Sequence, residues 1–244
     1  MQVSPGQDPP TEGSWHTLYF LPGIHDIGID YRIQANKSYY IPGDAIVFGT
    51  LTSMDAEDGL GVKIFGHGTL SGDRLPHPLY SDTPQEEHWK YRPVSIKSAV
   101  NVTVEGITIA NSAFHSVILM GGYDPEIYNE VRWVKIFTWR ANGDGINPFG
   151  NTALEDCFIR TQDDSTYVSG QGIRRVVYWQ DSNGSTFVLS PLGGENINKH
   201  PLVVEDCTVI YARAKVGWLV DRHLSTPDSL SPSGTTGPAA LCST

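Results

Sequence analysis

Several features are scarce in this chain of 244 residues. It contains no run of 18 apolar residues, which argues against a conventional membrane-spanning helix. Its first residues show no basic segment followed by an apolar stretch, so no signal peptide is visible. Lys and Arg total 17 against 27 Asp and Glu. The resulting net charge of −10 argues against nucleic acid or an anionic membrane as a partner.

Glycine and proline are plentiful, at 25 and 16 residues, and short alternating apolar segments recur along the chain. They recur at intervals of about 20 to 30 residues, the range of solenoid repeats, and cover residues 101–109, 131–136, 154–159, 175–179 and 202–210. No helical pattern of about 10 residues lies between them, which excludes a doubly wound α/β sheet. Hairpin turns at the shorter intervals of a β-sandwich are also missing. The sequence therefore predicts an all-β fold, a single-stranded right-handed parallel β-helix.

The strand pattern divides the chain into segments. We expect residues 1–14 to be disordered, residues 15–222 to form the β-helix, and residues 223–244 to be a disordered or irregular tail. Residues 73–92, rich in proline and charge, are a predicted loop over one face. Because a solenoid that stops near Val220 would expose the edge of its last coil, we expect truncation at the C-terminus.

Cysteine is rare, with three residues: Cys157, Cys207 and Cys242. Cys157 and Cys207 each follow Glu-Asp and lie about two predicted coils apart, or roughly 10 Å. A disulfide requires Cα atoms within about 7 Å. We therefore expect free thiols stacked inside the solenoid. The chain also shows no spacing typical of metal ligands, and we predict neither a metal nor a cofactor.

Three aspartates form the main candidate site. Asp144 lies in Asn-Gly-Asp-Gly-Ile, and Asp163 and Asp164 follow it by 19 and 20 residues. If one coil spans that interval and rises about 4.8 Å, Asp144 and Asp163 become neighbours on adjacent coils. Asp163 and Asp164 can face the same side only where the backbone bends at a corner. Because a buried charge is costly, we expect all three on the surface or in a cleft.

Close carboxylates are the groups that cleave glycosidic bonds, one as acid and one as base. Like charges also push their pKa values apart, so that one carboxyl stays protonated while another is ionised. The alternative is that Asp-Gly and Asp-Asp are ordinary turn residues. Their occurrence one coil apart favours the functional interpretation.

Further candidates carry weaker signals. His115 precedes Asp144 by one predicted coil, where it either lines the site or satisfies a turn. Arg213 and Lys215 are candidates to bind substrate hydroxyls, or they are ordinary surface cations. Aromatic residues at strand spacing are more often core than sugar platforms. The aromatic candidates for stacking on sugar are Trp139, Tyr167, Tyr178 and Trp179.

The motifs at residues 142–146 and 162–164 resemble the signature of pectin-lyase-like glycoside hydrolases. Residues 111–115, Asn-Ser-Ala-Phe-His, are similar to the polygalacturonase family, glycoside hydrolase family 28. The dextranase and isopullulanase family, glycoside hydrolase family 49, is the closer match. Its resemblance rests on the 19-residue spacing and on residues 155–164 and 206–215, and extends to the early coils.

The resemblance implies an inverting hydrolase in which Asp163 is the general acid. Asp144 and Asp164 would then hold and activate the attacking water. It also implies substrate contacts from the candidates above, Tyr167 among them, and no metal or organic cofactor. We expect a secreted, extracellular monomer that acts on a polysaccharide, an α-glucan first and a pectic galacturonan second.

One departure favours the α-glucan. Ser182-Asn183-Gly184 stands where polygalacturonases carry Gly-His-Gly, so the histidine is missing. Two alternatives stay open at this point. The first is a non-catalytic carbohydrate-binding remnant of such an enzyme. The second is a polysaccharide lyase on the same fold, although lyases usually need a basic site, often with calcium, and three aspartates fit that poorly.

Overall fold

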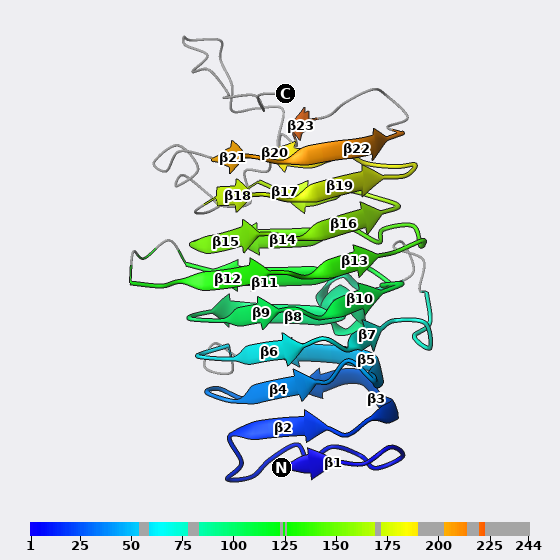
Figure 1. Ribbon diagram of the computed structural model, residues 1–244, viewed down its shortest axis with the longest axis vertical. Helices are drawn as coiled ribbons and strands as arrows, with labels where there is room; N and C mark the ends of the chain where they lie inside the picture. The colour runs from blue at the N-terminus through cyan, green and yellow to red at the C-terminus, as the bar shows by residue number, and fades with distance from the viewer. Residues whose placement is uncertain are drawn as a thin grey trace.

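The computed structural model describes residues 1–53, 59–77, 83–122, 124, 126–168, 172–189, 203–213 and 220–222. The chain winds upward in stacked coils from β1 at the bottom of Figure 1 to β23 at the top. Two parallel sheets, of nine and 14 strands, run the length of the stack. The predicted single-stranded right-handed parallel β-helix is therefore confirmed.

Each regular coil contributes one strand to each of three faces. The first face comprises β1 (Gln2–Val3), β2 (Thr17–Phe20), β4 (Ser38–Ile41), β6 (Lys63–Gly66), β9 (Thr103–Glu105), β12 (Asn129–Arg132), β15 (Thr152–Glu155), β18 (Gly172–Arg174) and β21 (Val204–Glu205). The second comprises β7 (Thr69–Ser71), β10 (Thr108–Ala110), β13 (Lys135–Phe137), β16 (Phe158–Thr161), β19 (Val177–Gln180) and β22 (Thr208–Ala212). The third comprises β8 (Val94–Ala99), β11 (Val117–Gly121), β14 (Ile146–Phe149), β17 (Thr166–Tyr167), β20 (Phe187–Leu189) and β23 (Val220–Arg222).

The second and third faces form one sheet because of β5 (Ala45–Ser53). Its first half pairs with β7 and its second half with β8, and β3 (Gly23–Arg32) pairs along it on the other side. A strand of nine residues thus bends around a corner that later coils turn with separate strands.

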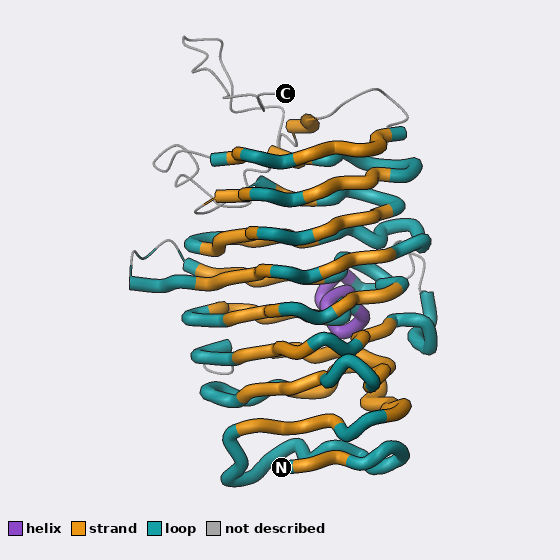
Figure 2. The backbone as a smooth tube through the Cα atoms, in the orientation of Figure 1, coloured by secondary structure: helices purple, strands orange, loops and turns teal. Residues whose placement is uncertain are grey.

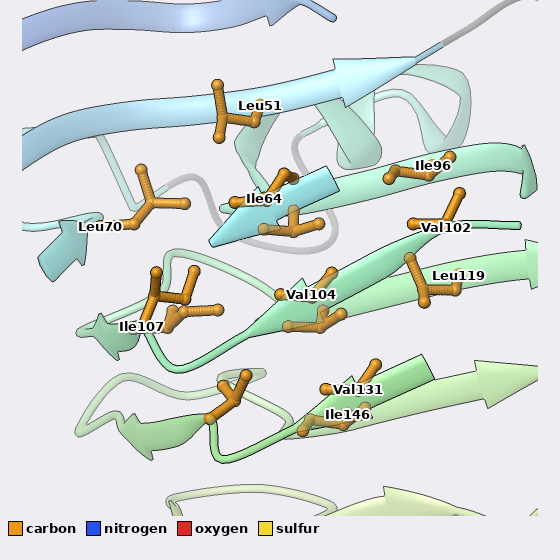
Figure 3. Packing of buried hydrophobic residues seen from close by; sticks show 14 of the residues in the cluster. Leu51, Ile64, Leu70, Ile96, Val102, Val104, Ile107, Leu119, Val131 and Ile146 are labelled. Carbon is orange, nitrogen blue, oxygen red and sulfur yellow. The ribbon is translucent and has the colours of Figure 1, made fainter. Parts of the chain in front are cut away.

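Stacked apolar rows fill the inside of the solenoid. Ile64, Val104 and Val131 occupy the same position on successive coils, one above another in Figure 3. Ile109, Ile136 and Ile159 form an equivalent row on the second face. All six side chains are fully buried. Because burying an aliphatic side chain contributes about 1.5–3 kcal/mol, these rows stabilise each coil against its neighbours.

The corner between the first and second faces repeats one backbone conformation. Gly106, Trp133, Asp156, Arg175 and Asp206 stack there, and their φ angles are 79°, 56°, 53°, 53° and 53°. Left-handed residues allow a tight turn without interrupting the ladder. Because each turn copies the one below, the strands that follow keep a common register.

The N-terminal segment differs from the prediction of disorder. Strand β1 pairs in parallel with β2, and Val3 is 2% exposed at the end of the core. The Tyr31 hydroxyl donates a hydrogen bond of 2.6 Å to the carbonyl oxygen of Pro10. Burial of Val3 and this contact order a stretch whose polar, proline-rich composition gives little strand signal.

The predicted excursion at residues 73–92 contains a short 3₁₀ helix, η1 (Gln85–Tyr91), shown in purple in Figure 2. It packs against β3 and β5. Its His88 ring stacks on Phe114 with centroids 5.0 Å apart, just before the corner that carries His115. No helix in the described part of the chain is long and apolar enough to cross a membrane.

Cys157 and Cys207 are free thiols, as predicted, with Cys157 buried and Cys207 partly buried. Burial raises the pKa of the Cys157 thiol to about 12. Cys242 and the predicted tail at 223–244 lie outside the described residues.

Replacing Ile136 by Ala should lower the free energy of unfolding by about 2–5 kcal/mol, because it opens a cavity in a continuous apolar row. Ile24→Ala is the matched control, since that isoleucine is 53% exposed on β3. It should cost less than about 0.5 kcal/mol. Urea unfolding of both variants checks this. Equal losses would contradict a core built from the inward rows.

Candidate active site

All three candidate aspartates lie at the corner that leads from the second face to the third. Asp144 falls between β13 and β14, while Asp163 and Asp164 fall between β16 and β17. Before Asp144 the backbone is irregular, with Asn142 at φ 57°. At Gly143, an added Cβ would lie 2.3 Å from the Thr138 Oγ1, so the close turn requires glycine. The sequence correctly predicted an irregular backbone here.

The strand register fixes which side chains share a row. Val117, Ile146 and Thr166 are aligned partners on β11, β14 and β17. Two residues earlier on each coil stand His115, Asp144 and Asp164. The backbone continues this alignment, because the Gly145 N–H donates to the Asp164 carbonyl oxygen at 2.8 Å.

This alignment corrects one detail of the prediction. The expected neighbour of Asp144 on the next coil was Asp163, but the ladder places Asp164 there. The coil from Ile146 to Thr166 spans 20 residues rather than 19. Asp144 and Asp164 are therefore stacked at about the 4.8 Å coil spacing, and Asp163 is offset by one residue.

The backbone bends between Gln162 and Asp164, so both adjacent carboxylates turn toward the same point. A Cβ added to Gly184, on the next coil, would lie 2.4 Å from Asp164 Oδ1 and 2.7 Å from Asp163 Oδ1. Gly184 also has a φ of 71°. Only glycine leaves room for both carboxylates there, and the predicted bend is confirmed.

Asp163 is held by a dense set of donors. Its Oδ2 accepts hydrogen bonds from the Asn142 backbone N–H at 3.2 Å and the Asn183 amide at 2.8 Å. Its Oδ1 accepts from the backbone N–H of Asp164 at 2.9 Å. Such donors favour the ionised carboxylate. The bond from Asn142 also ties Asp163 directly to the loop that carries Asp144.

Asp164 has donors on both oxygens. The Ser185 backbone N–H donates to Oδ1 at 2.6 Å, and the Tyr167 hydroxyl donates to Oδ2 at 3.1 Å. Burial raises the pKa of Tyr167, as do the charges of Asp144 and Asp164. The phenol therefore stays protonated and serves as a fixed donor to the cluster.

Asp144 contrasts with its neighbours. Its Oδ2 lies 3.0 Å from the Nδ1 of His115. Burial raises the pKa of Asp144 well above its ordinary value, and the charges of Asp163 and Asp164 add to the shift, against an opposing effect of Arg92. A protonated Asp144 carboxyl is the form this environment favours.

His115 complements that carboxyl. Burial lowers its pKa well below the ordinary value, and the positive charges of Arg92 and His88 lower it further. The neutral imidazole can accept the Asp144 proton in a hydrogen bond at Nδ1. The Asn147 side chain lies 2.7 Å from the same nitrogen. His115 thus contacts a candidate catalytic group, although it was predicted to bind substrate.

The aspartates are more buried than predicted. Asp144, Asp163 and Asp164 are 4%, 8% and 7% exposed, whereas the sequence suggested the surface or an open cleft. Donors on Asp163 and Asp164, together with a proton favoured on Asp144, offset the cost of burying like charges.

The two predicted basic contacts are placed differently. Arg213 is exposed, and its backbone N–H donates to the Gln180 carbonyl oxygen at 2.9 Å, at this same corner but further along the stack. Lys215 lies outside the described residues. Within the described ranges, no group of His, Cys, Asp and Glu is arranged to hold a metal ion.

Three contributors were not assigned to the site from sequence. Arg92 comes from the end of η1, and no motif announced it. Asn147 lies on β14 beside His115. Asn183 did carry a signal, because it occupies the position where a related family has histidine, but its bond to Asp163 depends on the coil register.

No family model matches this chain. Among curated proteins, a dextranase of Arthrobacter sp. (strain CB-8) is 24% identical over 216 residues, covering 80% of this chain and 32% of the relative. Isopullulanase of Aspergillus niger is 27% identical over 248 residues, covering 91% and 42%. The chain therefore spans less than half the length of these relatives.

Among solved structures, Dex49A from Penicillium minioluteum superposes with a TM-score of 0.65 at 17% identity. The match covers 95% of this chain and 44% of that protein. It supports the β-helical fold, and the sequence relatives confirm the predicted resemblance to dextranases and isopullulanase.

The pKa of Asp144 makes stability depend on pH. Because its pKa is raised on folding, the folded protein binds more protons than the unfolded chain above the ordinary value of 3.8. Stability therefore falls as pH rises through the window from 3.8 to the raised folded pKa. Asp144→Asn keeps the shape, provides an N–H donor for His115 and cannot ionise. It should be more stable than the parent above this window, with the difference shrinking toward pH 3.8.

Urea unfolding at about pH 4 and about pH 8 measures this difference. Asp44→Asn, which removes an exposed carboxylate, is the control and should change stability by less than about 0.5 kcal/mol at both values. An Asp144→Asn difference that is the same at both pH values would contradict a buried, shared proton.

Proposed function

We propose that this homologue of dextranases and isopullulanase is the β-helical catalytic part of a glycoside hydrolase that cleaves a polysaccharide with inversion. The observation that carries the proposal is the meeting of Asp144, Asp163 and Asp164 at one corner. Paired carboxyls in different protonation states are the requirement of this chemistry. An extracellular location and a monomeric state are further parts of the proposal.

The roles of the three groups follow their positions. Asp144 and Asp164 share one row on adjacent coils and would together hold and activate the water. Asp163, offset by one residue, would protonate the leaving oxygen, as the family resemblance implies. Inversion requires acid and base to lie on opposite faces of the sugar, with space for water between them.

The proton must be in a different place during the reaction than in the free site. Without substrate, the environment favours protonated Asp144, whereas Asp163 is surrounded by donors. Strongly coupled carboxyls share their protons as a group rather than singly. Contact of the glycosidic oxygen with Asp163 would favour protonation there and leave Asp144 ionised as a base beside Asp164.

The preferred substrate in this proposal is an α-glucan. The printed names of the relatives, dextranase and isopullulanase, point to glucans. The net charge of −10 opposes an anionic galacturonan, and Asn183 replaces the histidine of the galacturonan-cleaving family. A galacturonan is the second choice.

Asp163→Asn should lower the rate of polysaccharide hydrolysis by about 10²- to 10⁴-fold, the contribution of a general acid. The loss should be much smaller on an aryl oligoglucoside whose leaving group needs no protonation. Asp144→Asn is the matched comparison and should lose both activities alike. Reducing-sugar and chromophore assays measure these rates. If Asp144→Asn instead kept activity on the aryl substrate, Asp144 would be the acid.

Products of dextran or pullulan cleavage should appear first as the β-anomer, because water attacks an α-linkage from the opposite face. Proton NMR during the first minutes of reaction distinguishes the anomers. Initial release of the α-anomer would reject inversion. Binding without release of reducing ends would favour the non-catalytic remnant, and an unsaturated product absorbing in the ultraviolet would favour a lyase.

A further inference from the structure

The outer side of the second face carries a stack of aromatic rings and an arginine beside the acidic corner. Arg160, Trp179 and Tyr211 occupy the same row on β16, β19 and β22. The Arg160 guanidinium lies 4.9 Å from the ring centroid of Trp139 and 5.7 Å from that of Trp179. The Tyr211 ring continues the stack, 5.2 Å from Trp179. These four residues are called the aromatic row below.

The aromatic row is fixed in place by Asp181. Its carboxylate forms an ion pair of 2.5 Å with Arg160 and accepts a hydrogen bond of 2.7 Å from the Trp179 indole N–H. Asp181 thus holds a guanidinium and an indole at set angles. A rigid surface binds with less loss of conformational entropy than a mobile one.

Exposure separates Trp139 from the core aromatics. The Trp139 ring is 55% exposed and Tyr211 is 39% exposed, whereas Tyr178 on the inward side is fully buried. Tyr178 therefore belongs to the core, as aromatics at strand spacing usually do. Trp139 instead presents a large apolar ring to solvent, next to charged groups on Arg160 and Asp181.

The aromatic row leads directly to the carboxyls. Arg160 precedes Asp163 by three residues, which is at most roughly 10 Å of extended chain. Trp139 precedes Asp144 on the same corner segment, one coil below. Both coils that supply carboxyls therefore also supply a member of the row, so a chain bound across the corner would reach it.

We infer that the aromatic row is a saccharide-binding subsite that holds glucose units of the substrate away from the bond being cleaved. Sugar rings have an apolar face that packs on an aromatic ring, and hydroxyl groups that hydrogen-bond with arginine and carboxylate. The row offers all of these groups on one surface. The inference rests on the proposed function, because it extends the same site.

The chain provides a close internal control. Trp133 is 51% exposed, and the Arg132 guanidinium lies 4.8 Å from its ring centroid. It occupies the corner between the first and second faces, away from the carboxyls. Trp133 and Trp139 thus share residue type, exposure and a stacked arginine, and differ in position.

The experiment compares Trp139→Ala, Trp139→Phe and Trp133→Ala with the parent. Hydrolysis of isomaltotriose and isomalto-octaose gives kcat/KM for a short and a long substrate. Trp139→Ala should lower kcat/KM for the octaose roughly tenfold and leave the triose much less affected. Trp139→Phe should retain most activity, and Trp133→Ala should match the parent on both substrates.

Calorimetric binding of isomalto-octaose to the same variants in the Asp163→Asn background separates this inference from the proposed function. Weaker binding with Trp139→Ala, but not Trp133→Ala, supports the subsite even if the parent hydrolyses nothing. Equal binding of both variants overturns the subsite even if hydrolysis is normal. Absence of any binding to the Asp163→Asn protein overturns it as well.

Discussion

Vertical alignment of the coils determines what can meet at the acidic corner. The backbone hydrogen bonds between β11, β14 and β17 hold Val117, Ile146 and Thr166 in one row. That row leaves His115, Asp144 and Asp164 no choice of neighbour. The apolar rows inside the solenoid and the repeated left-handed turns at another corner stabilise the same alignment. A slip of one residue would turn inward side chains outward, so packing and site geometry depend on a single register.

The site exists because several small effects offset the cost of three buried acids. Backbone and side-chain donors from three consecutive coils converge on Asp163 and Asp164. Gly184 leaves the space in which both carboxylates fit. Asp144 receives fewer donors and is placed beside a neutral imidazole, which makes it the favoured carrier of a proton. The difference in protonation that glycosidic cleavage needs is thus built from unequal surroundings of identical side chains.

Much of this arrangement follows from the sequence. Alternating segments at coil spacing predict the parallel β-helix, and the interval between Asp144 and the Asp163–Asp164 pair predicts acids on adjacent coils. The exact partner was missed, because coil lengths vary and a pattern cannot distinguish 19 residues from 20. The burial of the acids also escaped prediction, since the donors from Asn142, Asn183 and Ser185 become neighbours only in the stacked coils. Likewise, Val3 gives almost no strand signal, yet β2 offers it a place in the core.

The central claim is that Asp144 and Asp164 interact across one coil step. The most direct test is a carbon-13 NMR titration of the Asp144 carboxyl in the parent and in Asp164→Asn. The account predicts that Asp144 in the parent titrates well above the ordinary value of 3.8, and that removal of the Asp164 charge lowers its midpoint. A midpoint near 3.8 in the parent, or one that does not move when Asp164 is replaced, would contradict the account.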